Sequence, residues 1–176
     1  MREWQAVVER LVAERGSRLT AYARMLVGPG ADPEDLVHDA IVKTFSRGRH
    51  IHDVDHAEAY VRRVMPTLII DRARSRSARS RATQRAFERS AAASDLDAGL
   101  DVRSALRGLP PRERACIVLR FFDDLTVPQI AAQLGLAEGT VKRYLADASG
   151  KLASQLNVSP HADETVLVSA PGKEGR

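Results

Sequence analysis

Apolar residues recur every three or four positions between residues 125 and 156, which is the spacing of amphipathic helices. A first short helix has its apolar side on Ile130, Ala131 and Leu134, and Gly135 after it is typical of a helix C-terminus. The apolar side of the helix that follows consists of Val141, Leu145, Ala148, Leu152 and Leu156. The pattern therefore predicts two helices joined by a tight turn.

The residues around these two helices indicate a specific motif. Thr126 precedes the first helix and Gln129 follows three residues later, which is the spacing of a capping box. The outer side of the second helix carries Gly139, Thr140, Lys142, Arg143 and Ala146. A glycine-containing turn and a basic outer face are typical of a helix-turn-helix, whose second helix enters the major groove of DNA. The alternative is a helical hairpin whose charged face only contacts solvent.

The N-terminal part of the chain shows the same helical period. A first helix is predicted from about Glu3 to Val27, with a candidate break at Gly16 and Ser17. Asp32 and Pro33 predict the start of a second helix, which runs to about residue 47. The apolar side of this second helix consists of Leu36, Val37, Ala40, Ile41 and Phe45, and its outer side carries Asp35, His38 and Asp39.

A third helix is predicted from about His56 to Arg74, after a loop at residues 48–55. Pro66 lies inside this helix. An interior proline costs about 3 kcal/mol because it removes a backbone donor and clashes with the preceding turn. We therefore expect a kink at Pro66, or a helix that begins afresh there.

Residues 77–96 are rich in Arg, Ser and Ala and contain almost no core residues, which indicates a linker. Beyond it, short helices are predicted at residues 97–106 and 112–122. The second of these is expected to bury Ala115, Ile117, Val118, Leu119 and Phe121 or Phe122. No segment reads as a sheet. The predicted fold is all-α, with two small helical domains at residues 1–76 and 97–157 and a disordered tail at 158–176.

The composition gives the chain a net positive charge and favours an intracellular protein. The formal charge is +4 and the isoelectric point is near 9.6, which suits a nucleic-acid partner. The one cysteine, Cys116, lies among apolar residues and is expected to be buried. The charged N-terminus is no signal peptide, and no apolar run approaches the roughly 20 residues needed to span a bilayer. We expect a cytoplasmic protein without membrane insertion.

A family resemblance is carried by three segments: ADPEDLVHDAIVKTF, AYVRRVMPTLIIDRARSR, and LPPRERACIVLRFFDDLTVPQIAAQLGLAEGTVKRYL. In this order they resemble region 2.2, regions 2.3 and 2.4, and region 4 of small bacterial sigma factors of the extracytoplasmic-function (ECF) type. The resemblance covers about residues 19–76 and 102–156. It implies a non-enzymatic factor that binds core RNA polymerase, directs it to −10 and −35 promoter elements and helps open the DNA. It also suggests an anti-sigma factor as an inhibitor.

The resemblance assigns residues to three surfaces. The surface for core polymerase would consist of Asp35, Leu36, His38, Asp39 and Ile41. The −10 reader would consist of Tyr60, Arg62, Arg63, Thr67, Asp71, Arg72 and Arg74. The −35 reader would consist of Gly139, Thr140, Lys142, Arg143 and Tyr144. No cofactor and no metal site is implied.

Two other functions remain as alternatives. The segment HIHDVDH at residues 50–56 is similar to the HxHxDH metal motif of metallo-β-lactamase-like hydrolases, but its spacing is one residue too long and no set of later ligands follows. A polar loop is the simpler interpretation. The second alternative is a stand-alone helix-turn-helix regulator with an N-terminal sensing domain. The acidic helix at residues 32–39 and the arginine-rich helix after it favour the sigma factor.

Overall fold

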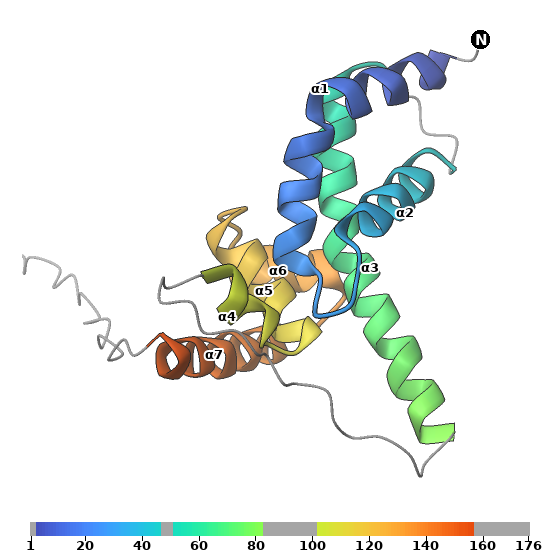
Figure 1. Cartoon of the computed structure of the whole chain (residues 1–176). Coiled ribbons are helices and arrows are strands. Elements are labelled where there is room, and N and C mark those ends of the chain that lie inside the picture. The colour runs from blue at the N-terminus through green and yellow to red at the C-terminus, as the bar shows by residue number, and fades with distance from the viewer. Residues whose placement is uncertain (1–2, 47–50, 83–101, 157–176) are drawn as a thin grey trace, which may run out of the picture.

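The computed structural model describes residues 3–46, 51–82 and 102–156, and these residues form helices and no strands (Figure 1). The helices are α1 Glu3–Leu26, α2 Pro33–Phe45, α3 Val54–Ala82, α4 Val102–Arg107, α5 Pro111–Phe121, α6 Val127–Leu134 and α7 Glu138–Gln155. The all-α prediction is confirmed. Residues 48–50, residues 83–96 of the predicted linker and the predicted tail lie outside the described residues.

Helices α1, α2 and α3 pack against one another and form the N-terminal lobe (Figure 1). The start of α2 is fixed as predicted, because the Asp32 carboxylate accepts a hydrogen bond of 2.8 Å from the Glu34 amide and Pro33 occupies the first turn. The buried side chains of this lobe include Leu11, Leu19, Leu26, Leu36, Ala40, Val61, Met65 and Ile70.

Neither Gly16 nor Pro66 ends a helix. Helix α1 continues through Gly16 and Ser17, and bends along its length instead of breaking (Figure 1). Helix α3 continues through Pro66 and extends to Ala82, so it includes the first six residues of the predicted linker. Pro66 is buried and follows Met65 in the core, so packing outweighs the local cost of the proline.

Helices α4 to α7 form the C-terminal lobe, which contains the predicted helix-turn-helix in α6 and α7. The side-chain oxygen Oε1 of Gln129 accepts a 2.8 Å hydrogen bond from the Thr126 backbone amide, which is the reciprocal half of the capping box. Gly135 ends α6 in the left-handed conformation with φ of 62°. Cys116 of α5 is fully buried, and burial raises the pKa of its thiol to about 12. The prediction fails at the end of α5, where Phe121 and Phe122 are both exposed because the helix extends beyond the core.

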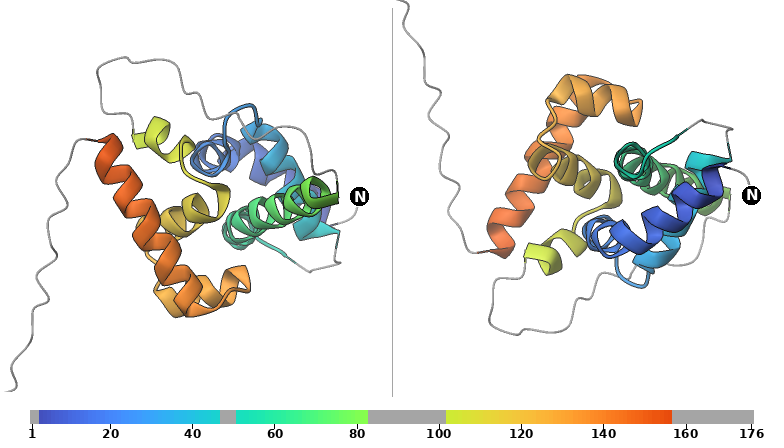
Figure 2. Two further views of the ribbon diagram at one scale, coloured as in Figure 1. Left: turned by 90° about the horizontal axis from the view of Figure 1, so that it is seen from below. Right: turned by 90° about the horizontal axis from the view of Figure 1, so that it is seen from above.

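The two lobes share one hydrophobic core. Both views in Figure 2 place α5 between α7 and the N-terminal lobe, and α5 and α6 both contact α3. Apolar residues of α5 and α6, including Val118, Leu119 and Ile130, join Val61 and Met65 of α3 in a single buried cluster. The structure therefore holds the C-terminal lobe against α3.

A buried arginine joins the lobes as well. Arg114 of α5 is only 3% exposed, and its guanidinium donates to the Leu26 carbonyl at the end of α1 at 2.9 Å. The same group donates to the carbonyls of Leu106, Arg107 and Leu109, at 3.1 to 3.3 Å. The C-terminal end of a helix carries partial negative charge on its unpaired carbonyls. The C-terminal ends of α1 and α4 therefore present favourable partners to the Arg114 cation.

Candidate nucleic-acid and polymerase interfaces

The predicted −35 residues lie in the first two turns of α7. Val141 and Ala148 of this helix are fully buried and define its inner face. Gly139, Lys142 and Arg143 are exposed, and Thr140 is half-buried. The inner face of α7 packs on α5 and α6. This packing holds the exposed Lys142 and Arg143 side chains on a fixed support.

Tyr144 differs from its neighbours in α7 because it also packs inward. Its hydroxyl accepts a hydrogen bond of 3.3 Å from Arg112, and the Arg143 guanidinium lies 5.5 Å from the centre of its ring. A cation over an aromatic face is attracted to it, so Tyr144 orients Arg143. In this structure Tyr144 serves as a support for the basic face.

The predicted −10 residues all lie on α3, from Tyr60 to Arg74. Several of them are engaged in ion pairs with α2 or within α3. Arg72 donates to Asp39, and Lys43 of α2 lies 3.3 Å from Asp71, which also lies 3.9 Å from Arg74. Two of the residues predicted to bind different partners, Asp39 and Arg72, are therefore in direct contact.

A cavity of about 410 Å³ adjoins the same stretch of α3. Its lining residues are Lys43, Thr44, Tyr60, Arg63, Val64, Thr67 and Gln133. Three of the predicted −10 residues meet here: an aromatic ring, a guanidinium and a hydroxyl. Gln133 comes from α6 of the other lobe, and its side chain donates to the Arg63 carbonyl at 3.3 Å. The C-terminal lobe thus borders the predicted −10 surface.

Among the predicted −10 residues, Arg62 makes an ion pair with the C-terminal lobe through its side chain. Its guanidinium donates to one oxygen of Asp123 at 2.7 Å, and the Tyr22 hydroxyl donates to the other at 2.5 Å. The guanidinium carbon also lies 4.5 Å from the centre of the Tyr22 ring. Tyr22 is 4% exposed, and burial followed by the charge of Asp123 raises the pKa of its hydroxyl. The neutral phenol is therefore a firm donor to Asp123.

The predicted polymerase-binding surface is mostly present on α2. Asp35, His38 and Asp39 are exposed and Ile41 is half-buried. Leu36 is an exception, because it is fully buried and no partner can touch its side chain. Leu36 packs in the core of the N-terminal lobe and supports the acidic face from behind.

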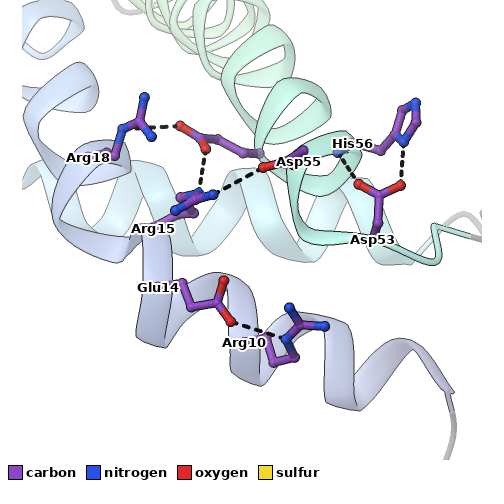
Figure 3. Close-up of polar contacts among 8 residues, drawn as sticks. Arg10, Glu14, Arg15, Arg18, Asp53, Asp55 and His56 are labelled. Carbon is purple, nitrogen blue, oxygen red and sulfur yellow. Dashed lines mark hydrogen bonds and ion pairs between the residues drawn. The ribbon is translucent and has the colours of Figure 1, made fainter.

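The histidine-rich segment before α3 has a structural role in the described residues. The Asp53 carboxylate accepts from the His56 amide at 2.8 Å and contacts the His56 imidazole (Figure 3). The hydrogen bonds from His56 hold the pKa of Asp53 below its usual value, and the carboxylate raises the pKa of His56. Within residues 3–46, 51–82 and 102–156, no three metal-ligating side chains gather; His50 and His161 lie outside this range.

Ion pairs next to this segment fix α1 against α3. Arg15 lies 3.1 Å from Asp55 and 3.1 Å from Glu58, and Arg18 lies 3.7 Å from Glu58 (Figure 3). The Glu58 side chain is 11% exposed, so its two arginine partners offset the cost of burying a carboxylate. These pairs set the orientation of the first turns of α3.

Comparisons with known proteins agree with this arrangement. Residues 11–79 match the family described as Sigma-70 region 2, and residues 99–152 match the one described as Sigma-70, region 4. The chain belongs to the sigma-70 family. It is 32% identical over 151 residues to the RNA polymerase sigma-E factor of Streptomyces coelicolor, covering 84% of this chain and 85% of that protein. It is 31% identical over 147 residues to the ECF RNA polymerase sigma factor SigL of Mycobacterium tuberculosis, covering 80% and 83%.

The fold is similar to that of the sigma factor RpoE of Bartonella quintana, solved in complex with the anti-sigma factor NepR. The TM-score is 0.57 at 23% identity, covering 86% of this chain and 97% of that chain. The predicted ECF sigma-factor resemblance and the region 2 and region 4 folds are confirmed. A sigma factor recognises promoters for RNA polymerase and is not an enzyme, so the stand-alone regulator is disfavoured. Among the described helices, none is long and apolar enough to cross a membrane.

The sequence did not reveal the residues that join the two lobes. Tyr22 and Asp123 are 101 positions apart, and Arg114 is 88 positions from Leu26. No local pattern links residues at such separations. Arg114 shows no signal of its own, because it follows two charged residues, Arg112 and Glu113, in the first turn of α5.

Proposed function

We propose that this sigma factor binds core RNA polymerase through the outer face of α2, reads the −10 element with α3 and reads the −35 element with α7. It acts in the cytoplasm, where the polymerase is. The observation that carries the proposal is the presence of both sigma regions in one chain, each presenting cationic side chains on a helix. A regulator with a separate sensing domain needs no region 2.

The polymerase contact is assigned to Asp35, His38, Asp39 and Ile41. Three of these side chains are exposed and Ile41 is half-buried, so the face combines negative charge with apolar area. An acidic face of this kind suits a basic helical partner, because opposite charges speed encounter and fix the register of binding. Helix α2 packs on α1 and α3 and makes no extensive contact with the C-terminal lobe, so its outer face is accessible.

The −10 contact is assigned to Tyr60, Arg62, Arg63, Thr67, Asp71, Arg72 and Arg74. A separated DNA strand is bound by stacking of bases on aromatic rings and by cations along the backbone. Tyr60 and Arg63 line the 410 Å³ cavity with the hydroxyl of Thr67, which supplies stacking, charge and hydrogen bonding in one place. This combination supports capture of an unstacked base.

The −35 contact is assigned to Gly139, Thr140, Lys142, Arg143 and Tyr144. Gly139 leaves open space above the helix start, because a Cβ there would meet nothing within 4 Å. The backbone of α7 can therefore approach DNA closely. Lys142 and Arg143 supply charge for phosphates or for base edges in the major groove.

We also propose three domain boundaries and one further partner. Residues 1–76 form the region 2 domain, 77–96 the linker and 97–157 the region 4 domain, with 158–176 as a tail. Helix α3 carries the first part of the linker as far as Ala82. The structural relative RpoE was solved with an anti-sigma factor, which supports an inhibitor of the same kind for this protein.

Transcription in vitro tests the −35 assignment. Wild-type protein and core RNA polymerase select promoters from a DNA library, and the selected promoters are then transcribed with Lys142→Ala/Arg143→Ala. We expect transcription to fall roughly tenfold or more, because each direct contact contributes about 1–3 kcal/mol. Arg107→Ala/Arg120→Ala removes the same charge from exposed positions of the same lobe and is the matched control. Equal losses in both variants, or a parallel loss of polymerase binding, contradict the assignment.

A further inference from the structure

Asp123 occupies an unusual position for an acidic residue. It follows the end of α5, and its side chain points from the C-terminal lobe to the N-terminal lobe, where both of its oxygens are used. Arg62 takes one oxygen and Tyr22 takes the other, at 2.7 and 2.5 Å. The Asp123 side chain is only 20% exposed, so this contact is largely shielded from solvent. Charge-assisted hydrogen bonds of this kind are about twice as strong as neutral ones.

Arg62 cannot serve two acidic partners with the same atoms. A guanidinium binds a carboxylate and a phosphate through the same planar set of N–H donors. The Arg62 donor that meets Asp123 is therefore occupied by protein, and it is the group expected to hold a DNA strand. The Tyr22 ring beneath the guanidinium fixes it in the orientation that favours Asp123.

The contact also has a consequence for the surface around it. With Asp123 in place, α6 lies against α3, and Gln133 reaches the Arg63 carbonyl beside the cavity. A strand that enters this cavity meets α6 at its border. Holding Asp123 on Arg62 therefore keeps the C-terminal lobe next to the predicted −10 surface (Figures 1 and 2).

We propose that Asp123 is a built-in competitor of nucleic acid: its carboxylate takes the place of a backbone phosphate on Arg62 and adds to the contacts that hold the free protein closed. Arg62 becomes available to DNA only when Asp123 leaves it and the lobes separate. The DNA part of this inference rests on the proposed function. The closed contact between the lobes does not.

The first test measures the separation of the lobes in the full chain. Fluorophores are placed on Ser46→Cys and Ser149→Cys, two exposed positions on different lobes, in a Cys116→Ala background. Asp123→Asn removes the charge and keeps the size of the side chain. Asp124→Asn makes the same change one residue away, at an exposed position with φ of 52° that asparagine tolerates. Circular dichroism verifies that each variant is folded.

We expect Asp123→Asn to shift the equilibrium toward separated lobes by about tenfold, which is typical of a lost charge-assisted hydrogen bond. Tyr22→Phe should shift it in the same direction by a smaller factor, since only the neutral donor is lost. Asp124→Asn should match the wild type. Equal energy transfer in Asp123→Asn, Asp124→Asn and wild type overturns the proposal.

The second test measures DNA binding by fluorescence anisotropy of a labelled oligothymidine single strand. Both asparagine variants raise the net charge equally, so non-specific attraction is matched. We expect about tenfold tighter binding by Asp123→Asn alone. If the lobes separate and the affinity does not rise, competition for Arg62 is refuted and its −10 role loses support. If the lobes stay together, the closed contact is refuted and the proposed function is untouched.

Discussion

Replacing the buried Arg114 should reveal how much its guanidinium stabilises the fold, both within the C-terminal lobe and across to the N-terminal lobe. Arg114→Met keeps an unbranched side chain of similar length and removes the guanidinium, with its hydrogen bonds to four backbone carbonyls. Each hydrogen bond to a charged group contributes about 1.5 kcal/mol at the lower end of the usual range. Nη1 carries two hydrogens for three of these carbonyls, so the contacts amount to about three full bonds, which stabilise the fold by about 4.5 kcal/mol.

Desolvation of the cation opposes this gain. Burial lowers the pKa of Arg114 from 12.5 to about 10, with Arg76 contributing a smaller effect in the same direction. That difference corresponds to roughly 3 kcal/mol of cost for the buried charge. The net loss in Arg114→Met is therefore about 1.5 kcal/mol, or roughly 3–6 °C in Tm for a chain of this size.

Chemical and thermal denaturation followed by circular dichroism measure this loss. Arg120→Met is the matched control, because Arg120 lies on the same helix, is exposed and donates to a single carbonyl, that of Leu125. It should cost less than about 1 kcal/mol. If Arg114→Met is as stable as Arg120→Met, the contacts of Arg114 with the Leu26 carbonyl and with the three carbonyls of its own lobe do not stabilise the fold.

Three further outcomes are expected. Gly28→Ala should destabilise the protein by about 1 kcal/mol in thermal melts, because a Cβ there would lie 3.0 Å from Arg114 Nη2; an unchanged Tm would show that the guanidinium moves freely. Glu113→Gln should cost about 1–2 kcal/mol in urea denaturation by removing a buried partner of α7, and a neutral effect would refute that role. Asp53→Asn should lower the pKa of His56 in an NMR titration, and an unchanged pKa would contradict their contact.

The His56 contact also gives a pH dependence with a defined sign. Asp53 raises the pKa of His56 in the folded protein, so the protonated imidazole contributes stability that is fully present below the unfolded pKa near 6.5. This contribution is lost as the pH rises through the higher folded pKa. Thermal melts between these pH values should therefore show a small decrease in stability for the wild type that is absent in Asp53→Asn.

Local features of the fold were predictable because their chemistry lies within a few residues. Asp32 before Pro33, and Thr126 three residues before Gln129, fix helix starts by neighbouring hydrogen bonds. Gly135 adopts the left-handed conformation that ends α6. Such signals depend on short spacings, which the sequence displays directly.

Features that depend on tertiary packing were not predictable in the same way. The helical spacing of apolar residues in α2 placed Leu36 correctly in the core, yet the family resemblance assigned the same residue to a binding surface. The local cost of Pro66 predicted a kink or a new helix start, and the packing of buried residues keeps α3 continuous through this position. The Tyr22–Asp123–Arg62 contact requires the two lobes to meet, which no spacing along the chain encodes.

A pull-down with purified core enzyme tests most directly whether α2 binds core RNA polymerase. Asp35→Arg reverses one exposed charge on the assigned face, and Glu9→Arg reverses one exposed charge on α1. Wild type and Glu9→Arg should retain the polymerase, and Asp35→Arg should lose most of the binding. Retention by Asp35→Arg would refute the assigned face, and absence of binding by the folded wild type would contradict the sigma-factor function itself.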